Sequence, residues 1–214
     1  MGPTESYLAQ KERWPKRGRH ILAQYTDDAV IVYQAFRTST GRAAAEGGAF
    51  GEGFSLSRMS WIKPNFLWMM FRSGWATKED QEVVLSISLK RSAFDRVLAA
   101  AVHSTYVPEV YGQKADWQLA VRRSDVRLQW DPDHSPRGGK VERRAIQLGL
   151  SGKTLERYAR EWIVGIEDIT DFVHAQHEHV TRGELDRLET PREEVYPVED
   201  RAVAARLEID PDTD

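Results

Sequence analysis

Residues 83–102 read Val-Val-Leu-Ser-Ile-Ser-Leu-Lys-Arg-Ser-Ala-Phe-Asp-Arg-Val-Leu-Ala-Ala-Ala-Val, and this stretch contains both periodicities that decide the fold class. In its first half, apolar residues alternate with serines through Leu89, which predicts a half-buried strand. In its second half, Phe94, Val97 and Leu98 recur at helical spacing, which predicts an amphipathic helix. The stretch is therefore a strand that leads directly into a helix.

The same two patterns recur along the chain without a regular alternation. Further strands are predicted at residues 20–25, 30–36, 126–130, 145–150 and 163–166. Further helices are predicted at residues 42–46, 64–72, 151–162 and 171–180. Strands and helices mixed in this way favour an α+β fold over a doubly wound sheet. We expect one domain with a mixed, mostly antiparallel sheet and flanking helices.

The two ends of the chain differ from its body in charge. Residues 1–24 hold five basic and two acidic side chains, whereas residues 184–214 hold eleven acidic and four basic ones. We therefore expect a mobile basic arm at residues 1–18, a single α+β domain at 19–183 and an acidic, poorly packed tail at 184–214.

Composition excludes several classes of chemistry and gives no global argument for nucleic acid. The chain has no cysteine, which excludes disulfides, thiolate zinc sites and a cysteine nucleophile. The most apolar run, residues 66–71, is too short to span a bilayer, and residues 1–19 do not resemble a secretory signal. The net charge is −3. We expect a cytoplasmic protein with no membrane partner.

One window of the sequence has the character of a ligand site. Residues 53–78 hold four cationic side chains, no acidic one and three of the seven tryptophans. Arginine and lysine bind phosphates, and aromatic rings stack on bases, so this composition suits an anionic, ring-bearing ligand such as a nucleotide or a dinucleotide. The ligand-binding residues that we predict are Arg58, Trp61, Lys63, Arg72, Ser73 and Trp75.

An alternative interpretation of the same window involves no ligand. Trp61, Trp68 and Trp75 recur every seven residues, which on a helix would form one buried face with the cations at its rim. The glycine-rich stretch 47–53 matches neither the phosphate-binding loop of nucleotide hydrolases nor the dinucleotide-binding fingerprint. The window alone does not decide between these alternatives.

Several blocks of the sequence resemble the family called domain of unknown function 4291. The blocks are Ala23–Tyr25, Val32–Phe36, Trp61–Pro64, Phe66–Met70, Arg72–Trp75, Gln129–Pro132, Gln147–Gly152 and Glu161–Val164. The resemblance covers roughly residues 19–180, and its most specific part is Trp-Ile-Lys-Pro at residues 61–64. The family name implies no activity.

A second, weaker resemblance is to ADP-ribosyltransferase-like folds. Residues 161–164, Glu-Trp-Ile-Val, are similar to the late strand of those folds that presents a glutamate. Tyr33 and Gln34 stand where the first strand of those folds carries a histidine or an arginine. The resemblance implies NAD as the cofactor, Glu161, Tyr33 and Gln34 as catalytic residues, and a carboxylate that stabilises the oxocarbenium charge.

Two other clusters suggest no additional site. The helical region near residues 174–179 holds three histidines but no carboxylate at the spacing of a known zinc motif, so we predict no metal. Residues 122–144 hold many arginines with acidic residues among them, which favours a solvated, self-paired surface over a nucleic-acid groove.

Three hypotheses follow, and they predict different structures. The first is a nucleotide-dependent transferase, ADP-ribosyltransferase-like, that acts on nucleic acid or a phosphorylated end. It predicts one cleft that contains Glu161, Tyr33, Gln34, Lys63 and Arg72. The second is a non-catalytic nucleotide or RNA binding module, which predicts Glu161 outside that cleft. The third is a protein-interaction domain, which predicts an exposed patch of three tryptophans.

Overall fold

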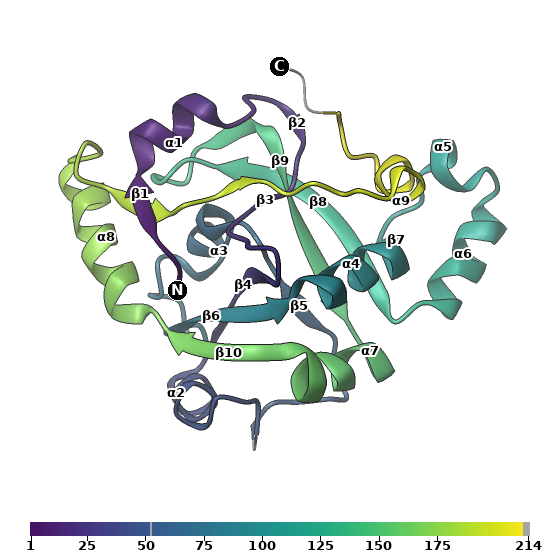
Figure 1. Cartoon of the computed structure of the whole chain (residues 1–214), viewed down its shortest axis with the longest axis horizontal. Helices are drawn as coiled ribbons and strands as arrows, with labels where there is room; N and C mark the ends of the chain where they lie inside the picture. The colour runs from purple at the N-terminus through teal and green to yellow at the C-terminus, as the bar shows by residue number, and fades with distance from the viewer. Residues whose placement is uncertain (52, 212–214) are drawn as a thin grey trace.

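Residues 83–90 form the central strand of a three-stranded antiparallel sheet (Figure 1). This computed structural model describes residues 1–51 and 53–211. β6 (Val83–Lys90) lies between β4 (Ala29–Phe36) and β10 (Ile163–Asp168). β6 is buried on both faces rather than half-buried, because helices cover the face on which the serines lie as well as the opposite one.

A second, five-stranded sheet runs steeply past the first in the view of Figure 1. Its order is β2 (Gly18–Arg19), β9 (Lys140–Leu150), β8 (Val126–His134) and β7 (Val102–His103), with β5 (Ser60–Ile62) also beside β9. β8 and β9 form a long antiparallel hairpin, whereas the pairs β2–β9 and β7–β8 are parallel. The sheet is therefore mixed, as predicted.

The two sheets are linked by a backbone bridge between Tyr33 and Lys63. β5 pairs with β9 of the five-stranded sheet, and Lys63 follows β5 directly. The Tyr33 N–H of β4 donates to the Lys63 carbonyl at 2.7 Å, and the Lys63 N–H donates to the Tyr33 carbonyl at 3.2 Å. Pro64 and the helix that follows then leave the sheet. The Trp-Ile-Lys-Pro block is therefore the seam between the two sheets.

Helices cover both faces of the three-stranded sheet. Those in contact with its strands are α2 (Thr38–Gly47), α3 (Phe66–Ser73), α4 (Arg91–Ala100) and α8 (Thr170–Arg182). α7 (Gly152–Arg157) and a π-helical turn, η1 (Tyr158–Trp162), lead into β10. α5 (Pro108–Tyr111) and α6 (Lys114–Arg123) lie together at one side of Figure 1. The α+β prediction is confirmed.

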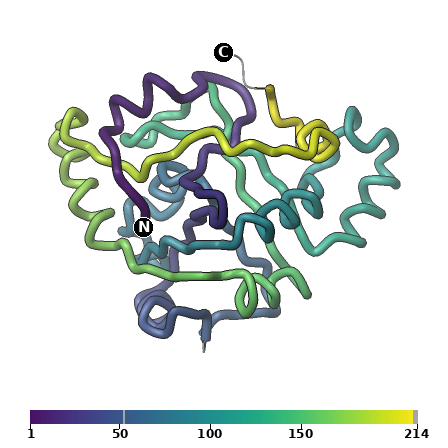
Figure 2. Tube along the Cα trace, viewed as in Figure 1, coloured from purple at the N-terminus to yellow at the C-terminus, as the bar shows by residue number. Residues whose placement is uncertain are grey.

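The ends of the chain are packed together, which corrects the expectation of a mobile arm and a poorly packed tail. β1 (Thr4–Ser6) pairs with β11 (Glu189–Pro191), and β3 (Leu22–Ala23) pairs with β12 (Glu194–Val195). Figure 2 shows the N-terminal segment in purple beside the C-terminal one in yellow. α1 (Tyr7–Arg13) and α9 (Arg201–Arg206) complete these segments.

The physical reason is that both ends carry apolar and hydrogen-bonding residues between their charges. Buried side chains of these segments include Tyr7, Gln10, Trp14, Leu188, Thr190, Glu193, Tyr196, Val203 and Leu207. The Trp14 indole N–H donates to the Glu193 carbonyl at 2.9 Å, and the Glu193 N–H donates to Gln10 Oε1 at 2.8 Å. Net charge therefore did not predict the packing. No helix in the described part of the chain is long and apolar enough to cross a membrane.

Candidate functional site

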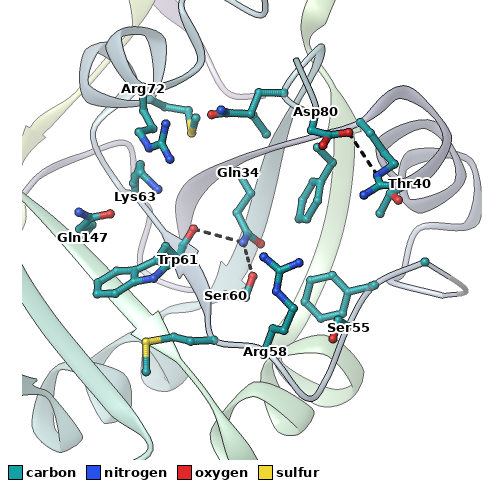
Figure 3. A pocket seen from close by; sticks show the side chains of 18 of the residues that line it. Gln34, Thr40, Ser55, Arg58, Ser60, Trp61, Lys63, Arg72, Asp80 and Gln147 are labelled. Carbon is teal, nitrogen blue, oxygen red and sulfur yellow. Dashed lines mark hydrogen bonds and ion pairs between the residues drawn. The ribbon is translucent and has the colours of Figure 1, made fainter. Parts of the chain in front are cut away.

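A cavity of about 590 Å³ opens along the seam between the two sheets (Figure 3). Its walls come from the end of β4, the start of β5, α3, the loop at residues 53–59 and the facing strands β8 and β9. Four of the six predicted ligand-binding residues line it, namely Arg58, Trp61, Lys63 and Arg72. The cavity therefore brings together most of the basic and aromatic window found in the sequence.

Three cationic side chains converge on the cavity. Figure 3 shows the side chains of Arg58, Lys63 and Arg72 pointing into the same hollow from different sides. Arg58 and Arg72 are exposed at the rim, whereas Lys63 is buried. Across residues 1–51 and 53–211, none of these three cationic groups has a carboxylate within ion-pair distance. Like charges that converge without counter-charges create a positive potential that attracts anions.

Lys63 is the least accessible of the three cations, because only 5% of its surface is exposed. The pKa of the Lys63 ammonium is lowered from its ordinary value of 10.5 to about 8, chiefly by burial and to a smaller extent by the nearby Arg72 guanidinium. Asp131 acts in the opposite direction as a smaller effect. An ammonium that is desolvated beside another cation is stabilised strongly by an anion. The cavity floor therefore carries a positive charge that forms no ion pair with any residue that the structure describes.

Among the described residues that line the cavity, Asp80 is the one acidic side chain, and it has its own partner. Asp80 Oδ1 lies 3.6 Å from Arg37 Nε, and both side chains are exposed at the mouth of the cavity. This ion pair is separate from the three cations described above, as the dashed line in Figure 3 shows. The acidic side chain therefore leaves the positive charge of the floor in place.

Gln34, predicted as a catalytic residue, lines the cavity with an amide that is fully engaged in the fold. Its Nε2 donates to Ser60 Oγ at 2.8 Å and to the Trp61 carbonyl at 3.2 Å. Its Oε1 accepts from the Tyr158 hydroxyl at 2.7 Å. Tyr158 is fully buried, and burial raises its pKa well above its ordinary value. The Gln34 side chain of β4 therefore links this strand to β5 and to η1 through hydrogen bonds.

Trp61 offers an aromatic surface in the cavity because its strand partner is a glycine. Trp61 of β5 lies opposite Gly149 of β9, and the indole covers that glycine. A Cβ atom at position 149 would lie 3.0 Å from Trp61 Cε2 and 2.6 Å from Met59 Sδ. The ring lines the cavity while it is supported by the backbone beneath it.

Replacing Gly149 with alanine is expected to displace the Trp61 ring and to cost about 1–3 kcal/mol of unfolding free energy, the usual cost of overpacking. Chemical denaturation followed by tryptophan fluorescence measures both effects. Gly165→Ala in β10 is the matched control, because its Cβ would meet only Ser88 at 3.9 Å. Equal stability of the two variants would contradict the packing described for Trp61.

Two of the predicted catalytic residues lie outside the cavity. Tyr33 precedes Gln34 in β4, so its side chain points to the opposite face, where it is fully buried and packs edge-on against Phe66. Glu161 lies in η1 rather than on a strand. Its carboxylate is 57% exposed and pairs with Arg157 at 3.1 Å. Neither residue lines the cavity.

Two of the predicted ligand-binding residues support the backbone instead. Ser73 is buried, and its hydroxyl donates to the Met69 carbonyl at 3.0 Å and accepts from the Ala76 N–H at 3.2 Å. Trp75 is buried as well, and its indole N–H donates to the Pro136 carbonyl at 3.2 Å. These residues end α3 and thereby position Arg72. Because Trp68 is also buried, the exposed tryptophan patch of the interaction hypothesis does not form.

Several cavity residues were not predicted from the sequence, and two of them, Gln129 of β8 and Gln147 of β9, lie on the wall formed by the second sheet. They are cross-strand partners on the sheet face that Trp61 shares. Their amides both donate to Asp131, Gln129 at 2.9 Å and Gln147 at 2.7 Å. The alternation in both strands showed that these positions lie off the apolar face. The register of β8 and β9, which places the two glutamines opposite each other, could not be predicted from the sequence.

Glu193, in the supposed tail, holds the helix that carries Arg72. Its Oε1 accepts from the Phe66 N–H at 2.6 Å, and its Oε2 accepts from Asn65 Nδ2 at 3.2 Å. Asn65 is the N-cap of α3 and accepts from the Trp68 N–H at 2.7 Å. Burial raises the pKa of Glu193 to about 8. The C-terminal segment thus fixes one wall of the cavity.

The histidines near residue 177 do not gather ligands for a metal. They lie on α8, where His179 pairs with Glu184 at 3.0 Å and the His177 ring stacks on Trp75. Among the residues that the structure describes, no group of three or more histidine, cysteine or acidic side chains is arranged to hold a metal ion.

Comparison with known proteins gives a family without an assigned activity. The chain matches none of the curated proteins with which it was compared. A family model does match, over residues 20–196, which includes every strand and helix that lines the cavity. The matched span also includes the C-terminal strand residues that pair with β3. The chain belongs to the family described as domain of unknown function DUF4291.

Proposed function

We propose that the protein binds a nucleotide, or the phosphorylated end of a nucleic-acid strand, in the cavity between its two sheets. The observation that carries this proposal is the convergence of Arg58, Lys63 and Arg72 on one cavity without a carboxylate partner among the described residues. Phosphate groups are the anions that suit such a cluster, because each guanidinium donates a fork of hydrogen bonds and the ammonium adds a point charge.

The cavity also suits the rest of a nucleotide. Its volume of about 590 Å³ is within the range of small-molecule sites. The half-buried Trp61 indole supplies a flat surface on which a base can stack. Gln129 and Gln147 supply polar groups on the same wall. Phosphate, ring and sugar would therefore each have a surface of matching chemistry.

Binding without catalysis is the form of the proposal that the site supports best. A transferase that cleaves NAD needs a carboxylate beside the ribose, where it stabilises the oxocarbenium charge. Glu161, which was expected in that role, lies outside the cavity in an exposed ion pair. Asp80 lines the cavity but pairs with Arg37 at its mouth. NAD is thus a candidate ligand here rather than a consumed substrate.

The experiment is calorimetric titration of ATP, NAD, ADP-ribose and a short 5′-phosphorylated RNA into the wild type and Arg72→Ala. Loss of a hydrogen-bonded charged partner is worth about 1.5–3 kcal/mol, so binding is expected to weaken about 10- to 100-fold in the variant. Arg160→Ala is the control, because Arg160 is exposed in η1 and pairs with Glu156 away from the cavity.

The outcomes separate the hypotheses. Binding of any of these ligands that weakens in Arg72→Ala and persists in Arg160→Ala supports the proposal. Equal binding by all three proteins would place the ligand elsewhere. Release of nicotinamide from NAD can be measured by chromatography. If the wild type releases nicotinamide and Glu161→Gln does not, the transferase hypothesis is favoured over binding alone.

A further inference from the structure

Asp131 fixes the orientation of two glutamine amides on the cavity wall. Gln129 Nε2 donates to Asp131 Oδ1 at 2.9 Å, and Gln147 Nε2 donates to Asp131 Oδ2 at 2.7 Å. An ionised carboxylate only accepts hydrogen bonds, so each amide must turn its NH₂ group toward Asp131. Each amide oxygen must then point away from Asp131. The carboxylate therefore sets which end of each glutamine faces the cavity.

Both amide oxygens are available to a ligand. Neither Gln129 Oε1 nor Gln147 Oε1 has a hydrogen-bond partner in the described part of the chain, and both residues are half-buried on the cavity wall. Figure 3 shows the Gln147 oxygen turned toward the interior of the cavity. Gln34 differs in this respect, because its oxygen is already taken by Tyr158. Two oriented acceptors thus lie side by side on cross-strand neighbours.

Gln129 and Gln147 lie near the residues proposed to bind the base and the phosphates. Gln147 lies two residues from Gly149 in β9 and so shares a sheet face with Trp61, the partner of Gly149. Asp131 acts electrostatically on Lys63, so this wall is close to the cation at the floor. The glutamines therefore share a sheet face with the proposed stacking surface of Trp61 and line the same cavity as Lys63.

We infer that Gln129 and Gln147 are specificity-determining residues, which select a ligand that presents two adjacent hydrogen-bond donors beside its phosphates. This inference rests on the proposed function and names the ligand class more closely. The chemistry that fits is the 2′,3′-diol of a ribonucleotide, and the exocyclic amine of a base is the other source of paired donors. Acceptors fixed in advance discriminate well, because a ligand without the donors leaves them unpaired.

The test compares ligands that differ in these donors. ADP, 2′-deoxy-ADP, inosine diphosphate and pyrophosphate are titrated into the wild type, Gln147→Met and Gln129→Met. The wild type is expected to bind ADP about 3- to 10-fold more tightly than 2′-deoxy-ADP, the effect of one lost hydrogen bond. Gln147→Met is expected to bind both with the weaker affinity, while pyrophosphate affinity changes less than about twofold. Gln118→Met, on the exposed face of α6, is the control.

Each outcome has a distinct meaning. Discrimination against inosine diphosphate instead of 2′-deoxy-ADP assigns the donors to the base amine and supports the inference. Equal binding of all three nucleotides by the wild type overturns it, and so does a loss of pyrophosphate binding in both glutamine variants as large as the loss of ADP binding. A wild type that binds neither pyrophosphate nor any nucleotide overturns the proposed function itself.

Discussion

Lys63→Met is expected to make the protein more stable at pH 7 by about 3 kcal/mol while it weakens ligand binding at least about 10-fold. The pKa of Lys63 is lowered from 10.5 to about 8, and each unit corresponds to about 1.36 kcal/mol of cost for the buried ammonium. Methionine has a similar length and flexibility, so it fills the space of the lysine stem without a charge. A buried cation that costs stability and faces a cavity is expected where an anion binds.

The pH dependence of this stabilisation follows from the direction of the shift. Below pH 8, the folded wild type must hold a charged, buried ammonium. Between pH 8 and 10.5, folded Lys63 is neutral while unfolded Lys63 is still charged, so the stability of the wild type rises with pH. The advantage of the variant is therefore largest below pH 8 and shrinks toward pH 10.5. Urea denaturation at several pH values measures it.

The control for this prediction is Lys140→Met, which replaces an exposed lysine of β9. Its stability is expected to stay within about 0.5 kcal/mol of the wild type at every pH, as for most surface changes. If Lys63→Met were less stable than the wild type at pH 7, Lys63 would be a structural residue with a hidden partner.

The stability of the wild type is expected to fall by about 4–5 kcal/mol between pH 4.5 and pH 8 because of Glu193. The pKa of this carboxyl is raised from 4.5 to about 8, chiefly by burial and with a smaller contribution from Asp133, while the Phe66 N–H and Arg143 partly oppose the rise. Over this interval the folded state keeps a proton that the unfolded state has lost, so each pH unit removes about 1.36 kcal/mol. Above pH 8 this contribution no longer changes.

Glu193→Gln separates this effect from the other titrating groups. The variant keeps an acceptor for the Phe66 N–H but cannot titrate at position 193. Its free energy of unfolding is therefore expected to rise relative to that of the wild type as pH increases from 4.5 to 8. Glu194→Gln is the control, because Glu194 is an exposed neighbour that pairs with Arg192. Parallel pH curves for the wild type and Glu193→Gln would show that Glu193 is already ionised in the folded protein.

The sequence predicted local structure well where one periodicity dominates. β4, β6 and α8 were each expected near their observed positions, because alternation and helical spacing depend on neighbours along the chain. The packing of the two ends was not predicted. Pairing of β1 with β11 joins residues at opposite ends of the chain, and net charge conceals the few apolar residues that hold them.

The candidate site was predicted in part, for a similar reason. Arg58, Lys63 and Arg72 were found because they share one window of sequence without acidic residues. Gln129 and Gln147 were missed because only the register of β8 and β9 places them on the same wall. The role expected of Glu161 depended on a strand, whereas the chain forms a π-helical turn there and exposes the carboxylate.

The most direct test of the central claim is calorimetric titration of ADP into the wild type and Lys63→Met at pH 7. The claim is that Arg58, Lys63 and Arg72 hold the phosphates of a nucleotide in the cavity. It predicts binding to the wild type and at least about 10-fold weaker binding to the variant, although the variant is the more stable protein. Equal affinity of the two proteins for ADP, or no binding to the wild type, would contradict the claim.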